Sequence, residues 1–157
     1  QQVGNAPPAN FSLMMPADGA MGVTTNPVLS WQPAEFANEY NVTMSTESDM
    51  TPVIWSTTVA TTQAVVPGGT PDTCTPASWT GTAVGFGGQT PATNQPYDFT
   101  TALVGDIDGN GTVDFPDLNF LLFQYGSTGP NNADLDGDND VDFADLNLLL
   151  SNYNSSC

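Results

Sequence analysis

Apolar and polar residues follow two different periods along this chain. Between residues 10 and 103, short apolar or alternating runs are separated by turn-rich segments such as PADGAMG, TESDMTP and PGGTPD. Runs of this length bounded by Gly, Pro, Asn and Asp predict β-strands joined by turns. In two segments after residue 104, apolar residues instead recur at i, i+3, i+4 and i+7, which predicts α-helices. The sequence therefore predicts two small domains of different class.

Seven runs in the first domain have the length and composition of strands. They are Phe11–Met15, Val28–Trp31, Tyr40–Ser45, Val53–Ser56, Thr62–Val66, Ser78–Val84 and Tyr97–Leu103. Seven short strands at this spacing are typical of an all-β sandwich, which we place at residues 10–103. Residues 1–9 contain two prolines and no apolar period, so we expect an N-terminal arm or tail that is disordered unless something captures it.

Each of the three tryptophans falls within one of these predicted strands. We expect Trp31 and Trp79 to pack in the core of the sandwich. For Trp55 two interpretations stay open, namely packing between the sheets or an exposed platform on which a carbohydrate can stack.

The second domain, residues 104–157, contains the same segment twice. An offset of 28 residues superposes GDIDGNGTVDFPDLNFLLFQYG, which starts at Gly105, on ADLDGDNDVDFADLNLLLSNYN, which starts at Ala133. A close internal repeat indicates one structural unit used twice. In each copy an acidic loop precedes an apolar helical stripe, which comprises Leu118, Leu121, Leu122 and Tyr125 in the first copy and Leu146, Leu149, Leu150 and Tyr153 in the second.

Both loops place oxygen ligands at positions 1, 3, 5, 7, 9 and 12, which is the spacing of an EF-hand calcium loop. The predicted ligands are Asp106, Asp108, Asn110, the carbonyl of Thr112, Asp114 and Asp117, then Asp134, Asp136, Asp138, the carbonyl of Asp140, Asp142 and Asp145. Gly111 and Asn139 stand at position 6, where the turn favours positive φ. We therefore predict two bound Ca²⁺ ions, and we expect Val113 and Val141 at position 8 to pair with each other across the loops.

No helical pattern precedes either loop, so the repeated unit is loop-then-helix, and in this it resembles the dockerin family. The resemblance covers roughly residues 105–153 and rests on the duplicated loop, the Asp at position 12 and the Leu-Leu helix. It implies calcium binding and a cohesin-like partner. The chain departs from the family at loop positions 10 and 11, which hold Phe115 and Pro116, then Phe143 and Ala144, and it lacks the basic residues that follow in cohesin-binding members.

The segments PADGAMGVTTNPVLSWQP, EYNVTMSTESDM, SWTGTAV and GFGGQTPA resemble a bacterial fibronectin type III domain over about residues 10–103. A generic immunoglobulin-like sandwich is the alternative. The predicted fold is thus an all-β, fibronectin type III-like sandwich followed by an α-helical, dockerin-like pair of calcium loop–helix segments.

Charge excludes several functions. The chain has 17 acidic residues and no Lys, Arg or His, so nothing can neutralise the phosphates of nucleic acid or of an anionic membrane surface. No apolar run reaches the length of a membrane span. A Ser or Cys nucleophile would lack a basic partner, and the acids outside the loops show no facing pair of the kind that glycosidases use. We expect no enzymatic activity.

Several features indicate an extracellular or cell-surface protein. Cys74 and Cys157 suit an oxidising compartment, where they form a bridge within the chain, a bridge between chains or free thiols. A chain that starts at Gln1 suggests processing of a secreted precursor. Sequons at Asn10, Asn41 and Asn154 are candidate N-glycosylation sites, whereas the sequon at Asn110 coincides with a predicted calcium ligand.

Two functional hypotheses follow. In the first, the protein is a calcium-stabilised structural subunit that self-assembles into a homopolymeric filament, sheath or surface layer, with residues 1–9 adding to a neighbour's sheet edge. In the second, the loop–helix pair is a binding module for a cohesin-like partner, with Phe115 and Phe143 as contacts. Carbohydrate binding through Trp55 ranks last.

Overall fold

The computed structural model describes residues 6–157. The chain divides into two compact units, Gln1–Thr101 and Ala102–Cys157. This division lies two residues before the boundary that we placed between residues 103 and 104. Among the described residues, no helix is both long enough and apolar enough to cross a membrane.

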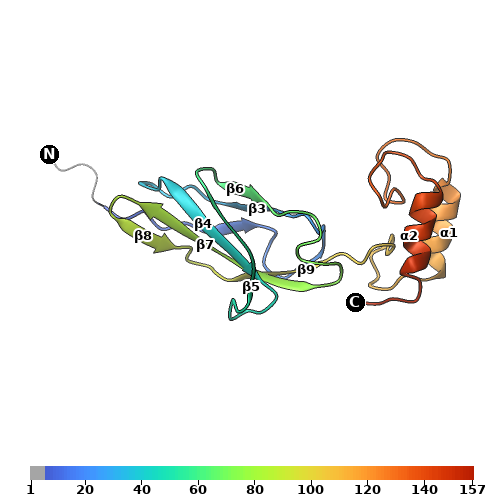
Figure 1. Cartoon of the computed structure of the whole chain (residues 1–157), viewed down its shortest axis with the longest axis horizontal. Coiled ribbons are helices and arrows are strands. Elements are labelled where there is room, and N and C mark those ends of the chain that lie inside the picture. The colour runs from blue at the N-terminus through green and yellow to red at the C-terminus, as the bar shows by residue number, and fades with distance from the viewer. Residues whose placement is uncertain (1–5) are drawn as a thin grey trace. The chain divides into compact units, whose positions relative to one another are not determined.

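The first unit consists of two β-sheets (Figure 1). The three-stranded sheet has the order β1-β3-β6, with β1 at Leu13–Met15, β3 at Val28–Trp31 and β6 at Gln63–Val65. The larger sheet has the order β2-β9-β7-β4-β5, and β8 pairs with β7. Its strands are β2 (Ala20–Val23), β4 (Glu39–Ser45), β5 (Val53–Val59), β7 (Pro76–Gly85), β8 (Gly88–Pro91) and β9 (Tyr97–Thr101).

All seven predicted runs contain a strand, but the structure adds two strands in segments that we expected to be turns. One is β2, which pairs in parallel with β9 and contains Gly22 at a φ of 66°. The other is β8, which forms a hairpin with β7 in which Gly85 opposes Gly88. Each strand contains a glycine and β8 ends at a proline, which are turn residues, although the neighbouring strands supply backbone partners.

The core lies between the two sheets and contains two of the tryptophans. Trp31 from β3 is 2% exposed and Trp79 from β7 is 0% exposed, with their ring centroids 6.2 Å apart. Their predicted core position is confirmed. Trp55 on β5 is half-buried and packs against the same core, which favours packing over a free carbohydrate platform.

Part of the predicted N-terminal arm belongs to the sandwich itself. Pro8 is buried, and its carbonyl accepts a hydrogen bond from the Thr90 hydroxyl at 2.6 Å. The backbone N–H of Ala9 donates to the carbonyl of Glu35 at 2.9 Å. The expectation that the arm is disordered is therefore wrong for Pro8 and Ala9, because their backbone groups are used within the same unit. Residues 1–5 lie outside the described residues.

The second unit contains two helices, α1 (Phe115–Gln124) and α2 (Phe143–Ser151), which lie side by side (Figure 1). Leu121 and Leu149 are fully buried. Leu122 and Leu150 are about half exposed, at 51% and 50%. The buried stripe is thus narrower than the sequence predicts, because a pair of helices covers only one side of each member.

Candidate metal centre

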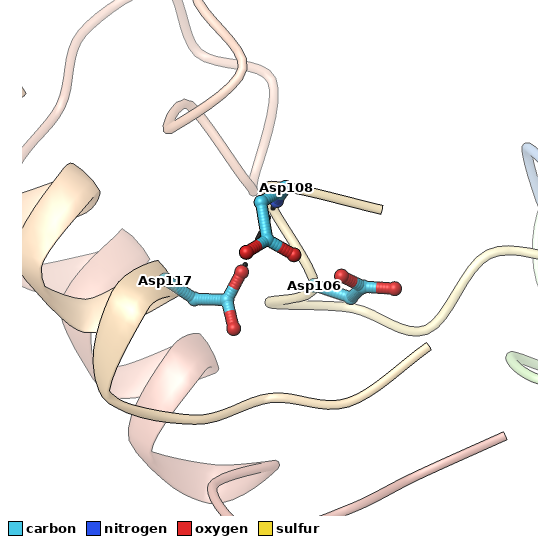
Figure 2. A group of neighbouring side chains, drawn as sticks. All are labelled: Asp106, Asp108 and Asp117. Carbon is cyan, nitrogen blue, oxygen red and sulfur yellow. Dashed lines mark hydrogen bonds between the residues drawn. The ribbon is translucent and has the colours of Figure 1, made fainter. Parts of the chain in front are cut away.

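The acidic residues of both loops gather into close groups. In the first loop, ligand oxygens of Asp106, Asp108 and Asp117 lie within 4.8 Å of one another. Figure 2 shows Asp117 extending from the first turn of α1 toward Asp108 in the loop. The second loop holds two such groups within the same distance limit, Asp134 with Asp136 and Asp138, and Asp140 with Asp142 and Asp145.

The aspartate at loop position 1 organises the turn that follows it. In the first loop Asp106 Oδ1 accepts hydrogen bonds from the backbone N–H groups of Gly109 and Asn110 at 2.9 and 3.0 Å, and Oδ2 accepts from Gly111 at 2.9 Å. Asp134 accepts in the same way from Gly137 and Asn139. Position 6 has a positive φ in both loops, 87° at Gly111 and 73° at Asn139, which confirms the predicted turn.

The aspartate at position 12 joins each loop to its helix. Asp117 is 0% exposed; its Oδ1 accepts from the backbone N–H groups of Ile107 and Asp108 at 2.7 and 3.1 Å, and its Oδ2 accepts from Asp114 at 2.9 Å. Each of these aspartates also lies in the first turn of its helix, where the helix dipole favours negative charge.

Asp145 repeats this arrangement in the second loop. It is also 0% exposed and accepts from Leu135, Asp136 and Asp142 at 2.6, 3.2 and 2.8 Å. Burial alone would raise the pKa of Asp145, but these backbone donors outweigh it and hold the pKa below its ordinary value. The buried carboxyl therefore stays ionised.

Other carboxylates of the second loop are crowded without such compensation. The charge of Asp138, followed by desolvation, raises the pKa of Asp140. Desolvation is the main cause that raises the pKa of Asp136, and the charge of Asp138 adds to it. A bound cation would reverse both effects, since it favours the charged form of every carboxylate around it.

Two buried carboxylate oxygens in this unit have no hydrogen-bond partner. They are Oδ1 of Asp114, at position 9 of the first loop, and Oδ1 of Asp140, at position 7 of the second. A buried oxygen without a donor is costly, and a hard divalent cation such as Ca²⁺ binds oxygen ligands of this kind. The residues present therefore fit calcium.

Not all predicted ligands lie in the close acidic groups, and one group contains the side chain of a residue whose carbonyl is the predicted ligand. The side chain of Asp140, rather than its carbonyl alone, lies with Asp142 and Asp145. Asp114 lies outside the close group of the first loop. Asn110 Oδ1 accepts hydrogen bonds from the backbone N–H and the hydroxyl of Thr112 at 2.8 and 2.6 Å.

The predicted pairing of Val113 with Val141 is wrong. The N–H of Val113 donates to Ser155 at 2.9 Å, and Asn154 donates to the carbonyl of Val113 at 2.8 Å. In the other repeat the N–H of Val141 donates to Ser127 at 3.0 Å, and Gly126 donates to the carbonyl of Val141 at 2.7 Å. Each loop is thus paired with the segment that follows the helix of the other repeat, and not with the other loop.

These contacts are reciprocal, because each repeat pairs with the loop of the other, and this arrangement is named here the ring. The segment after α1, residues 126–129, pairs with the second loop, and the segment after α2, residues 154–157, pairs with the first loop. Two further backbone hydrogen bonds are equivalent under the 28-residue repeat. The N–H of Gly129 donates to the carbonyl of Asn139 at 2.7 Å, and the N–H of Cys157 donates to the carbonyl of Gly111 at 2.9 Å. The backbone of the first loop therefore pairs with residues 154–157.

The remaining candidate sites are on the surface or already bonded. Neither Cys74 nor Cys157 is a free thiol, since both are disulfide-bonded. Asn10, Asn41 and Asn154 are exposed, as a glycosylated asparagine must be. Phe115 and Phe143 are 66% and 67% exposed, so both are accessible to a partner.

Comparison with known proteins finds Fn3-like solved structures that are similar to this chain. No protein-family model matches it, and no curated protein matches it. Among solved structures, an Fn3-like protein from Clostridium thermocellum is similar, with 23% identity and a TM-score of 0.42 over 63% of this chain and 93% of its own.

Two further solved structures are similar at the same level. The fn3 domain of the human collagen alpha-1(XX) chain has 15% identity and a TM-score of 0.45, covering 67% of this chain and 95% of its own. An alpha-L-rhamnosidase from Dictyoglumus thermophilum has 17% identity and a TM-score of 0.44, over 70% of this chain and 14% of its own. The chain therefore has Fn3-like structural neighbours, and its fold is mainly β-sheet with two short helices.

The ring predicts that the two loops respond differently to loss of the C-terminus. Deleting residues 154–157 removes backbone bonds from the first loop and none from the second. We expect calcium affinity at the first loop to fall by about tenfold or more, because several hydrogen bonds of about 1 kcal/mol each are lost. Isothermal titration calorimetry measures both sites.

The deletion also removes Cys157, so both proteins in this comparison carry Cys74→Ser, and the full-length control carries Cys157→Ser in addition. The control should retain two sites of wild-type affinity. An equal loss of affinity at both loops in the deletion variant would contradict the ring.

Proposed function

We propose that this protein is a secreted structural subunit that is stabilised by two calcium ions and self-assembles into an extracellular filament, sheath or surface layer. The observation that carries the calcium part is the duplicated loop with its buried, unpartnered Asp114 and Asp140 oxygens. Ten carboxylates occupy the two loops of a chain that has no cationic side chain. Two bound Ca²⁺ ions supply four positive charges and change the formal net charge from −17 to −13.

Self-assembly of such a chain has to occur where carboxylates are absent. Salt bridges between copies are impossible without Lys, Arg or His, and like charges that face each other across an interface are unfavourable. An uncharged stretch runs from Leu118 to Ala133. Within it, Phe120 and Phe123 of α1 are 42% and 83% exposed, and with Pro116, Asn119 and Leu122 they line one surface hollow. We propose that this face, named here the α1 face, contacts a second copy.

The sandwich offers further uncharged surface. Met14, Met15 and Met21 are each at least half exposed. In the described part of the chain, β1 and β6 form the edges of the smaller sheet, and β2 and β5 form the ends of the main strand order of the larger one. Edge strands accept an added strand from another chain. Since Pro8 and Ala9 bond within their own unit, strand addition by the arm would depend on residues 1–5.

A second candidate function is the binding module. The exposure of Phe115 and Phe143 favours it, because burial of these side chains would have removed them from any contact. In this alternative the acidic surface around the helices suits a cohesin-like partner that carries Lys or Arg around an apolar centre.

Removal of calcium should destabilise the second unit. Each site contributes roughly 3 kcal/mol at a hundredfold excess of calcium over its dissociation constant, so the melting temperature should fall by about 10 °C or more. Circular dichroism of the helices reports this unit.

Tryptophan fluorescence provides an internal control, because Trp31, Trp55 and Trp79 all lie in the first unit. Its transition should move less than the helical one when EGTA replaces calcium. A helical melting curve that is the same in EGTA and in calcium would contradict the calcium assignment.

Assembly is tested by multi-angle light scattering after size exclusion, in calcium and in EGTA. We expect large assemblies in calcium that shrink in EGTA. Phe123→Ser should abolish them, because it removes the most exposed apolar side chain of the α1 face. Phe86→Ser changes an equally exposed phenylalanine of the sandwich (85% exposed) and should assemble like the wild type. A monomer in both buffers would contradict self-assembly and leave the binding module as the function to pursue.

A further inference from the structure

The first loop contains a feature that the second lacks. Asn110 and Gly111, at loop positions 5 and 6, form the chain's only Asn-Gly dipeptide, and the equivalent residues in the second loop are Asp138 and Asn139. In an Asn-Gly pair the backbone nitrogen of Gly reaches the side-chain amide of Asn with the least hindrance, since Gly has no Cβ. A Cβ at Gly111 would meet no other group within 4 Å, so the turn is open on that side.

Neighbouring groups in the loop contact both reacting partners. The N–H of Gly111 donates to Asp106 Oδ2 at 2.9 Å, so the attacking nitrogen lies in the turn that Asp106 organises. Asn110 Oδ1 accepts from the N–H and the hydroxyl of Thr112 at 2.8 and 2.6 Å. Donors at this oxygen stabilise the negative charge that develops when the amide carbon is attacked.

We propose that Asn110 is a self-modification site whose reaction is gated by the metal in the first loop. In the empty loop the Gly111 nitrogen attacks Cγ of Asn110, the new N–Cγ bond forms as the Cγ–Nδ2 bond breaks, and ammonia leaves with the proton of the Gly111 amide. Water then opens the cyclic imide at either carbonyl carbon. The products are aspartate or isoaspartate, with one water consumed, one ammonia released and no change of oxidation state.

The gate rests on the calcium sites of the proposed function. Asn110 is a predicted ligand, so an ion bound to its oxygen would fix the side chain whose Cγ the Gly111 nitrogen must reach. Only the empty loop reacts. Calcium at a hundredfold excess over its dissociation constant should therefore slow the reaction by about a hundredfold.

The two products have different consequences for the loop. Aspartate at residue 110 reproduces the charge that Asp138 already provides in the second loop. Isoaspartate adds a carbon to the main chain between positions 5 and 6 and displaces the turn at Gly111, which Asp106 holds through three N–H groups. A first loop left without metal would thus accumulate a permanent change that the second loop does not undergo.

The test incubates the full chain at mildly alkaline pH in EGTA and in calcium and maps peptides by mass spectrometry. We expect replacement of NH2 by OH at Asn110 in EGTA and its suppression in calcium. Gly111→Asn, which copies position 6 of the second loop, keeps the amide and the turn and should slow the reaction in EGTA. Asp138→Asn removes a carboxylate from the second loop without creating an Asn-Gly pair and should leave residue 138 unmodified.

Calorimetry on the same samples separates the two claims. An unmodified Asn110 in EGTA, when the same chain unfolded in urea reacts, would overturn the proposal. Equal rates in EGTA and in calcium, with calcium shown to be bound, would overturn the gate and leave the calcium sites intact. An absence of calcium binding in calorimetry would instead overturn the proposed function on which the gate rests.

Discussion

No side chain in this protein carries a positive charge, and the second unit is built around that constraint. A buried carboxylate can then be stabilised by backbone N–H groups, by polar side chains, by ordered water or by a bound cation, but not by a salt bridge to a side chain. Asp117 and Asp145 use the first means, since each is fully buried and accepts three backbone hydrogen bonds. Asp114 and Asp140 retain buried oxygens that lack a donor within the chain, and a bound cation would supply a partner for them.

The same constraint shapes the contacts within the unit and its outer surface. Each loop is completed by backbone pairing with the segment after the other helix, so each repeat supplies backbone partners to the loop of the other. Outside the loops, the proposed self-association would use uncharged surface, and the α1 face is such a surface. The corresponding positions on α2 differ, because Leu148 and Ser151 replace Phe120 and Phe123. The repeat is therefore symmetric in its loops and asymmetric in the surface that it presents.

The sequence predicts the strands, the helices and the acidic loops well because each depends on local chemistry. Alternating runs identify β3, β4 and β7, the repeat identifies both loops, and position 6 requires a residue that tolerates positive φ. Tertiary pairing is not encoded locally. The partners of Val113 and Val141 are more than ten residues distant, and two equal repeats allow either loop-to-loop or loop-to-tail pairing. The strands β2 and β8 were missed because their neighbours, not their own side chains, make them strands.

The most direct test of the interlocked loops is backbone hydrogen exchange of the Val113 and Val141 amides by NMR. These two N–H groups donate to Ser155 and Ser127, respectively. We expect strong protection of both amides in calcium and loss of protection at both when EGTA removes the ion. Protection that persists at either valine in EGTA, or amides that exchange freely in saturating calcium, would contradict it.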